Sequence, residues 1–369
     1  MKLFIKGLVT VSIMASCANV HAQFRKYSNE FLNIGAGARG LGMGGATVAS
    51  VTDATAAYWN PAALVHVTDH PSLCVMHAEY FAGIGKYDYA SLAIPTKNGN
   101  RTLGISFMRF AVDDIPNTLY LVEPDGSINY NNITTFSSAD YAVLLSYAQV
   151  FKKTDNMQIN FGGNAKVIYR SVGTFAKAWG FGLDAALQMR KDNWRFGLVA
   201  RDVTTTFNAW SFTFSEKEKE ILYLTKNDIP VKSTELTAPR LIAAAGYNFV
   251  FNKKFSLLAE ADLHFTFDGK RNTVISTNAI SIDPNIGVEA NINNSVFLRA
   301  GISNFQKALE DGDTTNQKKV WIYQPSLGAG FKFGNVGIDY AFTNLANQAN
   351  PLYTHVFSLR IDLVKKETK

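Results

Sequence analysis

The feature that most constrains the fold of this 369-residue chain is an alternation of apolar with small or polar residues. In residues 336–342, Val, Ile, Tyr and Phe share one face, while Gly, Asp and Ala share the other. A period of two residues is that of a β-strand, whereas a helix needs apolar residues three and four apart. About fourteen such segments follow one another in the chain, which predicts an all-β protein. Their centres lie near Val75, Ser91, Ser106, Leu144, Asn164, Leu183, Val199, Ala245, Ala259, Val288, Leu298, Gly330, Ile338 and Leu359.

The second face of these segments distinguishes a membrane barrel from a soluble sandwich. A sandwich would pack its apolar faces inward and expose faces rich in Lys and Glu, but here the second face is rich in Gly and Ala. Around residues 73–80 and 103–110 the alternation slips, and Arg109 falls on the apolar face, which suggests a β-bulge there.

The connections between the segments alternate in length, as in outer-membrane barrels with short periplasmic turns and long outer loops. We therefore predict a transmembrane antiparallel β-barrel of about fourteen strands over residues 71–363, with its apolar face against outer-membrane lipid. Short connections are 95–101, 150–157, 190–193, 250–254, 291–295 and 334–335, and long ones are 111–138, 204–238, 264–282, 303–324 and 343–353.

The first 22 residues have the pattern of a secretory signal peptide. Lys2 and Lys6 precede an apolar stretch, and small residues ending at Ala22 form a cleavage pattern. A second reading, in which Cys17 becomes a lipidated N-terminus, stays open. An exported barrel belongs in the cell outer membrane, and residues 364–369 then form a short periplasmic tail.

Composition and motifs argue against several classes of function. The formal net charge is +6, with no basic patch interleaved with aromatic residues, so we expect no nucleic-acid binding. His66 and His70 are four residues apart but precede a turn, which gives no metal site. No pairing of a nucleophile with a base can be argued from spacing. We therefore expect neither an enzyme nor a bound cofactor.

Residues 23–70, between the signal and the first strand, are rich in Gly and Ala and do not alternate. Gly35, Gly37 and Gly40 match a dinucleotide-binding fingerprint in letters, but that motif requires a strand before it and a βαβ unit after it. We predict instead a hatch that packs inside the barrel, where glycine permits close approach. Within it, Asp53 is expected to cap a short helix that Pro61 ends.

This segment resembles the PorV/PorQ family of Bacteroidetes outer-membrane proteins, which is related to the fatty-acid transporter FadL. The resemblance implies a fourteen-stranded barrel with an N-terminal hatch, and a role in the type IX secretion system beside sorting-domain cargo or other secretion components. The matching residues are Arg39, Gly42, Met43, Gly44, Ala46, Asp53, Trp59, Asn60, Pro61 and Ala62.

Charged residues on the predicted inner face nearly balance in sign. A selective ion channel would concentrate one sign, so we expect ion-pair networks that hold the hatch. The principal members are Asp184, Arg201, Arg240, Glu260, Glu289, Arg299, Asp339 and Arg360, and the wider set adds Lys166, Arg195, Lys332, Asp262 and Asp362.

The longest outer connection carries a capping-box pattern from Ser215 to Glu218, which predicts a helix. We consider Glu216, Glu218 and Leu222 as candidates for contacting a partner protein. Two functions remain open at this point. The first is an interaction component of type IX secretion, which binds or shuttles cargo, and the alternative is a FadL-like transporter of a hydrophobic small molecule.

Overall fold

The computed structural model describes residues 23–24, 28–123, 125–230, 232–309, 318–345 and 353–364. The predicted signal peptide and residues 365–369 of the predicted tail lie outside this range. Among the described residues, no helix combines the length and the apolar character needed to cross a bilayer.

Strands make up most of the described chain and form one sheet. The first half contains β1 (Gln23–Phe24), β2 (Ser72–Tyr80), β3 (Gly85–Pro95), β4 (Arg101–Asn117), β5 (Thr134–Lys153), β6 (Met157–Val172), β7 (Ala176–Lys191), β8 (Trp194–Arg201) and β9 (Thr206–Phe212). The second half contains β10 (Ser233–Thr237), β11 (Arg240–Val250), β12 (Phe255–Thr266), β13 (Ile275–Ser276), β14 (Ser281–Ile292), β15 (Val296–Leu309), β16 (Lys319–Phe333), β17 (Val336–Thr343) and β18 (Thr354–Asp362).

The sheet closes on itself, because β18 pairs antiparallel with β2. Each of the two pairs β8/β9 and β10/β11 acts as one interrupted strand, since β8 and β9 pair with successive parts of β7. With the short β1 and β13 left aside, the wall is a closed antiparallel barrel of 14 strands. The predicted fold class is confirmed, and each predicted strand centre lies within one of these wall strands. A closed sheet also rules out the sandwich.

The two faces of the wall differ as the alternation predicts. On β17, Ile338 is 51% exposed on the outer face, whereas its neighbour Asp339 is buried inside. The outer face carries a continuous set of exposed aliphatic and aromatic residues on most strands. Such a surface suits lipid contact and explains why the pattern was readable from sequence.

The outer ends of several strands differ from the prediction. Residues predicted to begin long loops continue as paired strands, so that β4 runs to Asn117 and β15 runs to Leu309, while β16 already starts at Lys319.

The β-bulge predicted within residues 73–80 or 103–110 is not found at either place. Pairing is regular there, and the register shifts between Val112 and Ile115 instead. The apolar alternation of the sequence slips at Arg109 because this side chain does face outward, where it pairs with Asp88.

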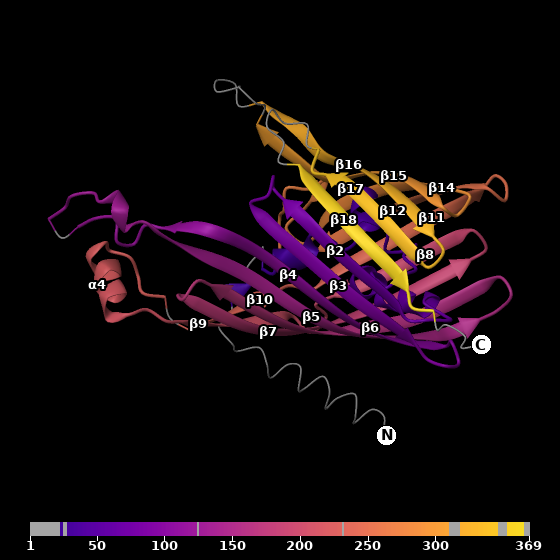
Figure 1. Cartoon of the computed structure of the whole chain (residues 1–369), viewed down its shortest axis with the longest axis horizontal. Coiled ribbons are helices and arrows are strands. Elements are labelled where there is room, and N and C mark those ends of the chain that lie inside the picture. The colour runs from indigo at the N-terminus through magenta and orange to yellow at the C-terminus, as the bar shows by residue number, and fades with distance from the viewer. Residues whose placement is uncertain are drawn as a thin grey trace, which may run out of the picture.

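Inside the barrel lies the hatch, drawn in indigo behind β3 and β4 in Figure 1. Residues 29–67 of this segment are largely buried. Its short helical turns are η1 (Glu30–Asn33), α2 (Ala38–Gly42), α3 (Ala56–Trp59) and η2 (Pro61–His66). No strand precedes the glycine fingerprint within described residues 28–37, so the dinucleotide reading has no support.

The outer loops carry one longer helix, α4 (Glu216–Leu224), and the turn η3 (Tyr130–Asn132). Ser215 Oγ accepts from the Glu218 backbone N–H at 3.3 Å, and Glu218 Oε2 accepts from the Ser215 N–H at 2.6 Å. The predicted capping box is therefore confirmed. Figure 1 shows α4 beyond the ends of the wall strands, at the same end as the long β4–β5 hairpin.

Candidate functional site

The hatch is held first through its backbone, by two neighbouring carboxylates of β12. Asp262 Oδ2 accepts from the N–H groups of Thr47 and Val48 at 3.0 and 3.1 Å. Glu260 Oε1 accepts from the Ala49 N–H at 2.6 Å. Three consecutive backbone donors are thus satisfied by side chains of the wall, which a buried loop without its own secondary structure requires.

A chain of charges joins α2 to β14, β15 and β17, on the part of the wall next to β12. Arg39 Nε and Nη2 donate to Glu289 at 2.9 and 3.0 Å, and Arg299 Nε donates to the same carboxylate at 2.6 Å. Arg299 Nη1 in turn contacts Asp339 at 2.7 Å. Two-pronged contacts of this kind fix orientation as well as distance.

Other predicted lumen charges also contact the hatch or each other. Arg360 Nη1 donates to Asp53 at 2.9 Å. Arg201 donates to the backbone carbonyls of Leu32 and Tyr58. Asp184 lies 2.8 Å from Lys166 Nζ, and that ammonium also contacts Asp202. Opposite charges of the wall thus pair with each other and with the hatch, whereas Arg195, Lys332 and Asp362 of the predicted set form no ion pair among the described residues.

The Gly-Met-Gly run packs where the wall itself carries glycine. Met43 is fully buried, and a Cβ added at Gly301 of β15 would collide with the Met43 backbone. Gly42 approaches Gly328 of β16, where an added Cβ would lie 3.0 Å from the Gly328 Cα. Gly44 has a φ of +64°, which glycine adopts readily. The small residues on the inner face therefore admit a second backbone.

The Trp-Asn-Pro run forms the centre of the hatch. Trp59 Nε1 donates to the Ala36 carbonyl at 2.7 Å. Asn60 is fully buried, donates to the carbonyls of Val48 and Leu187, and accepts from the Ala62 N–H. The N-cap of α3 is Thr55 and not Asp53 as expected, and Asp53 instead begins the turn before the helix, where Oδ1 accepts from the backbone N–H and the hydroxyl of Thr55. Pro61 ends α3 and also begins η2, where its missing N–H costs no hydrogen bond.

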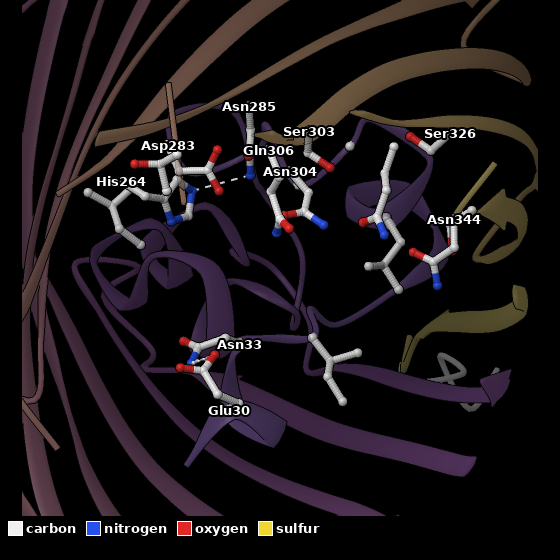
Figure 2. A pocket seen from close by; sticks show the side chains of 18 of the residues that line it. Glu30, Asn33, His264, Asp283, Asn285, Ser303, Asn304, Gln306, Ser326 and Asn344 are labelled. Carbon is white, nitrogen blue, oxygen red and sulfur yellow. Dashed lines mark hydrogen bonds between the residues drawn. The ribbon is translucent and has the colours of Figure 1, made fainter. Parts of the chain in front are cut away.

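A cavity of about 470 Å³ opens on the side of the hatch that faces the long loops. Its floor includes hatch residues Ile34, Leu41, Tyr58 and Trp59, and strand residues supply polar groups around them. Figure 2 shows Glu30 and Asn33 of the hatch across the opening from His264, Asp283 and Asn285 of the wall. The volume falls within the roughly 300–1,000 Å³ of ligand pockets.

Charges at this outer cavity are mixed. Arg240 Nη2 lies 2.6 Å from Glu30, and Arg271 Nη2 lies 2.6 Å from Asp268 in the loop after β12. Burial raises the pKa of Asp268, but its hydrogen bond and ion pair with Arg271 outweigh burial and leave that pKa below its ordinary value. The cavity thus combines an aromatic floor with fixed polar groups at its edge, a combination that suits a small molecule with an apolar body.

On the other side of the hatch, a second cavity of about 730 Å³ faces the short turns. It is lined by Arg39, Asp53, Glu289, Arg299 and Arg360 of the networks above. Arg190 and Arg195 also line it. The hatch therefore separates an outer from a periplasmic cavity.

Sequence reasoning did not identify several of these residues. Tyr58 lies beside the Trp-Asn-Pro motif, but nothing in the motif indicated that its ring would floor a cavity. Arg271 belongs to a long loop whose conformation no local pattern specified. Arg190 was assigned to a turn, whereas β7 continues to Lys191 and turns the Arg190 side chain inward. The candidates Glu216, Glu218 and Leu222 lie on α4, remote from both cavities.

No metal site emerges from the part of the chain that the structure describes, since no group of three or more His, Cys, Asp and Glu residues is placed to hold an ion. No protein-family model and no curated sequence relative matches the chain.

Solved structures do match. The toluene transporter TodX of Pseudomonas putida aligns with a TM-score of 0.54 at 13% identity, covering 89% of this chain and 98% of that one. At this identity the match shows a shared fold, and two further structures give the same result. The Ralstonia pickettii toluene transporter TbuX gives 0.52 at 14% identity, with 89% and 99% covered, and the monoaromatic hydrocarbon channel CymD gives 0.52 at 13%, with 94% and 100% covered.

These similarities show the fold, a closed antiparallel barrel of 14 strands, which is consistent with the predicted place in the outer membrane. They do not support the PorV/PorQ assignment, the Bacteroidetes source or the type IX secretion role that the hatch motif suggested. The same Gly-Met-Gly and Trp-Asn-Pro residues are accounted for by packing and hydrogen bonding within the hatch.

Proposed function

We propose that this FadL-like barrel is a channel for a small molecule with an apolar body, which enters through the outer cavity, and that it has no catalytic activity. The observation that carries the proposal is the aromatic and aliphatic floor formed by Ile34, Leu41, Tyr58 and Trp59 beneath polar edges. The likeness in fold to channels and transporters of monoaromatic hydrocarbons supports it.

The floor of the cavity belongs to the hatch, so the ligand would contact the same element that blocks the lumen. A molecule that crosses along the barrel axis must displace part of this segment. The Trp59 ring packs over Gly40 and ties back to Ala36, so movement of the α2 turn would alter the floor directly. Binding and opening would then be coupled through one segment.

Uptake of a monoaromatic hydrocarbon such as radiolabelled toluene tests the proposal. Cells that express the barrel should accumulate the label faster than cells with an empty vector. Asn285→Trp, which fills the outer cavity beside Gly45, should remove the difference. Asn227→Trp, on the exposed segment after α4, should not. Equal uptake with and without the barrel, for toluene and for longer apolar probes, would reject the channel.

A second candidate function is that of a type IX secretion component that binds cargo or a partner, and two surface features favour a protein partner, though neither is specific to secretion. On α4, Tyr223 and Leu224 are 79% and 69% exposed, beyond the membrane wall. On the outer face of the wall, His77 and Arg109 both pair with Asp88. Charges on a lipid-facing wall cost about 2–4 kcal/mol at mid-membrane and about 0–1 kcal/mol near its edge. A protein partner that bound over these residues would shield them from lipid.

A further inference from the structure

The periplasmic cavity contains two arginines that the networks of the hatch do not use. Arg190 near the end of β7 and Arg195 near the start of β8 are directly opposite each other in the antiparallel register. Both line the cavity. Like charges in directly opposite positions of two strands repel and are destabilising. An arrangement of this kind therefore calls for a compensating anion.

No carboxylate of the described residues contacts this pair. Neither guanidinium forms an ion pair there, and Arg190 Nε and Nη2 are shut off from solvent without a hydrogen-bond partner. A buried donor left unsatisfied costs about 1–3 kcal/mol, and more when it is charged.

Carboxylates do surround the cavity, but none of them lies within ion-pair distance of either guanidinium among the described residues. Asp53 pairs with Arg360, and Glu289 pairs with Arg39 and Arg299. Glu260 accepts from the hatch backbone through Oε1, its Oε2 has no hydrogen-bond partner, and it forms no ion pair with either arginine among the described residues. Asp69 and Asp362 also line the cavity and pair with neither arginine. No carboxylate thus contacts the two guanidinium groups directly, and their hydrogen-bond donors are left for a group that enters the cavity.

The surroundings provide room and further donors. Gly246 of β11 lies opposite Arg195 in the register, so the directly opposite position carries no side chain. Asn248 and Ser256 also line the cavity and carry an amide and a hydroxyl group that donate to oxygen. Two guanidinium groups with neutral donors nearby match a carboxylate or phosphate group, which each guanidinium can bind through two parallel hydrogen bonds.

We propose that Arg190 and Arg195 form an oxyanion-binding site at the periplasmic end of the lumen, which takes a carboxylate or phosphate group. The site does not depend on the proposed channel function. Its ligand has two sources, which share this chemistry. One is free phosphate from the periplasm, and the other is the carboxylate of an amphipathic molecule that has passed the hatch.

Calorimetric titration of the purified barrel, in non-ionic detergent and a chloride-poor buffer, separates the sources. Inorganic phosphate is the probe for a free anion, and benzoate is the probe for an aromatic carboxylate. We expect binding of at least one probe. Arg190→Gln or Arg195→Gln should weaken it about tenfold or more, because each removes charge-assisted hydrogen bonds, and the double variant should abolish it. Preference for phosphate or for benzoate identifies the source.

Arg101→Gln is the matched control, since it removes a positive charge at the same end of the barrel but outside the cavity lining. It should bind as the unmodified barrel does. Thermal unfolding gives a second readout. The ligand should raise the melting temperature of the unmodified barrel and not of the double variant. Absence of binding by both probes, or binding that survives in the double variant, overturns the proposal. Failure of toluene uptake would leave these results unaffected.

Discussion

Arg39 of the hatch and Glu289 of β14 form a two-pronged ion pair, with Nε–Oε2 and Nη2–Oε1 distances of 2.9 and 3.0 Å. The two partners are not equivalent. Glu289 also pairs with Arg299, whereas Arg39 pairs with no second carboxylate among the described residues. Removing one or the other residue should therefore have unequal consequences.

We predict that Glu289→Gln loosens the hatch more than Arg39→Met. The first change leaves a buried guanidinium without its carboxylate, at a cost of about 3–5 kcal/mol. The second leaves Glu289 with Arg299 and costs about 1.5–3 kcal/mol. Protease cleavage within residues 29–67 and the melting temperature measure the difference. Lys219→Met, at an exposed ion pair of α4, is the control. The reverse order of the two variants would contradict the ion-pair account.

Asn60→Ala should free the hatch without melting the wall. The side chain makes three hydrogen bonds, to Val48, Leu187 and Ala62, and the barrel strands close without it. A buried group that loses its partners costs about 1–3 kcal/mol. Limited proteolysis should therefore show a more accessible hatch at unchanged barrel yield. Asn227→Ala, at an exposed position, serves as comparison. Collapse of barrel yield with an inaccessible hatch would instead indicate a role in assembly.

Gly301→Ala should displace the hatch by steric conflict. The added methyl group would overlap the backbone of Met43, and backbone cannot move away as a side chain can. Gly246→Ala is a matched control on the inner face, since an added Cβ there meets nothing nearer than 3.3 Å. Conductance of the barrel in planar bilayers measures the outcome. We expect ion current through Gly301→Ala and little through Gly246→Ala, and equal currents would show that the hatch does not seal the lumen.

The wall of this protein could be predicted from sequence because each strand lies between two different environments. Ile338 faces outward and Asp339 inward, so the alternation of apolar and polar residues along the strand reflects its two environments, lipid and lumen. Arg109 broke the pattern, and the prediction of a bulge followed. In the structure Arg109 instead forms an outward ion pair with Asp88 of the neighbouring strand β3, and a local sequence pattern does not reveal a partner on another strand.

The hatch could be predicted as an element but not as a structure. Its backbone depends on Asp262 and Glu260, more than two hundred positions away, and its packing depends on Gly301. No periodicity records such contacts. The same limit applies to Arg190, since its role depends on where β7 ends and on its register with Arg195. A two-residue error at a strand end was enough to hide the pair.

The last prediction separates the two candidate functions through α4. Deletion of Glu216–Leu224 should leave the barrel folded, because the helix lies beyond the wall and loop changes are tolerated when the strands close without them. Heat-modifiable migration on gels checks this. If the barrel is a channel, the deletion should leave toluene uptake unchanged while Asn285→Trp abolishes it.

If the barrel instead serves secretion through a partner at α4, the deletion should reduce surface attachment of sorting-domain proteins while Asn285→Trp does not. The exposed Tyr223 and Leu224 would supply the contact, and the double change Tyr223→Ser with Leu224→Ser should reproduce the deletion. Glu220→Ser, a change of similar size on the same helix, is the control. Quantitative proteomics of the cell surface measures the effect. An unchanged surface proteome beside a loss of uptake in Asn285→Trp would reject the secretion role.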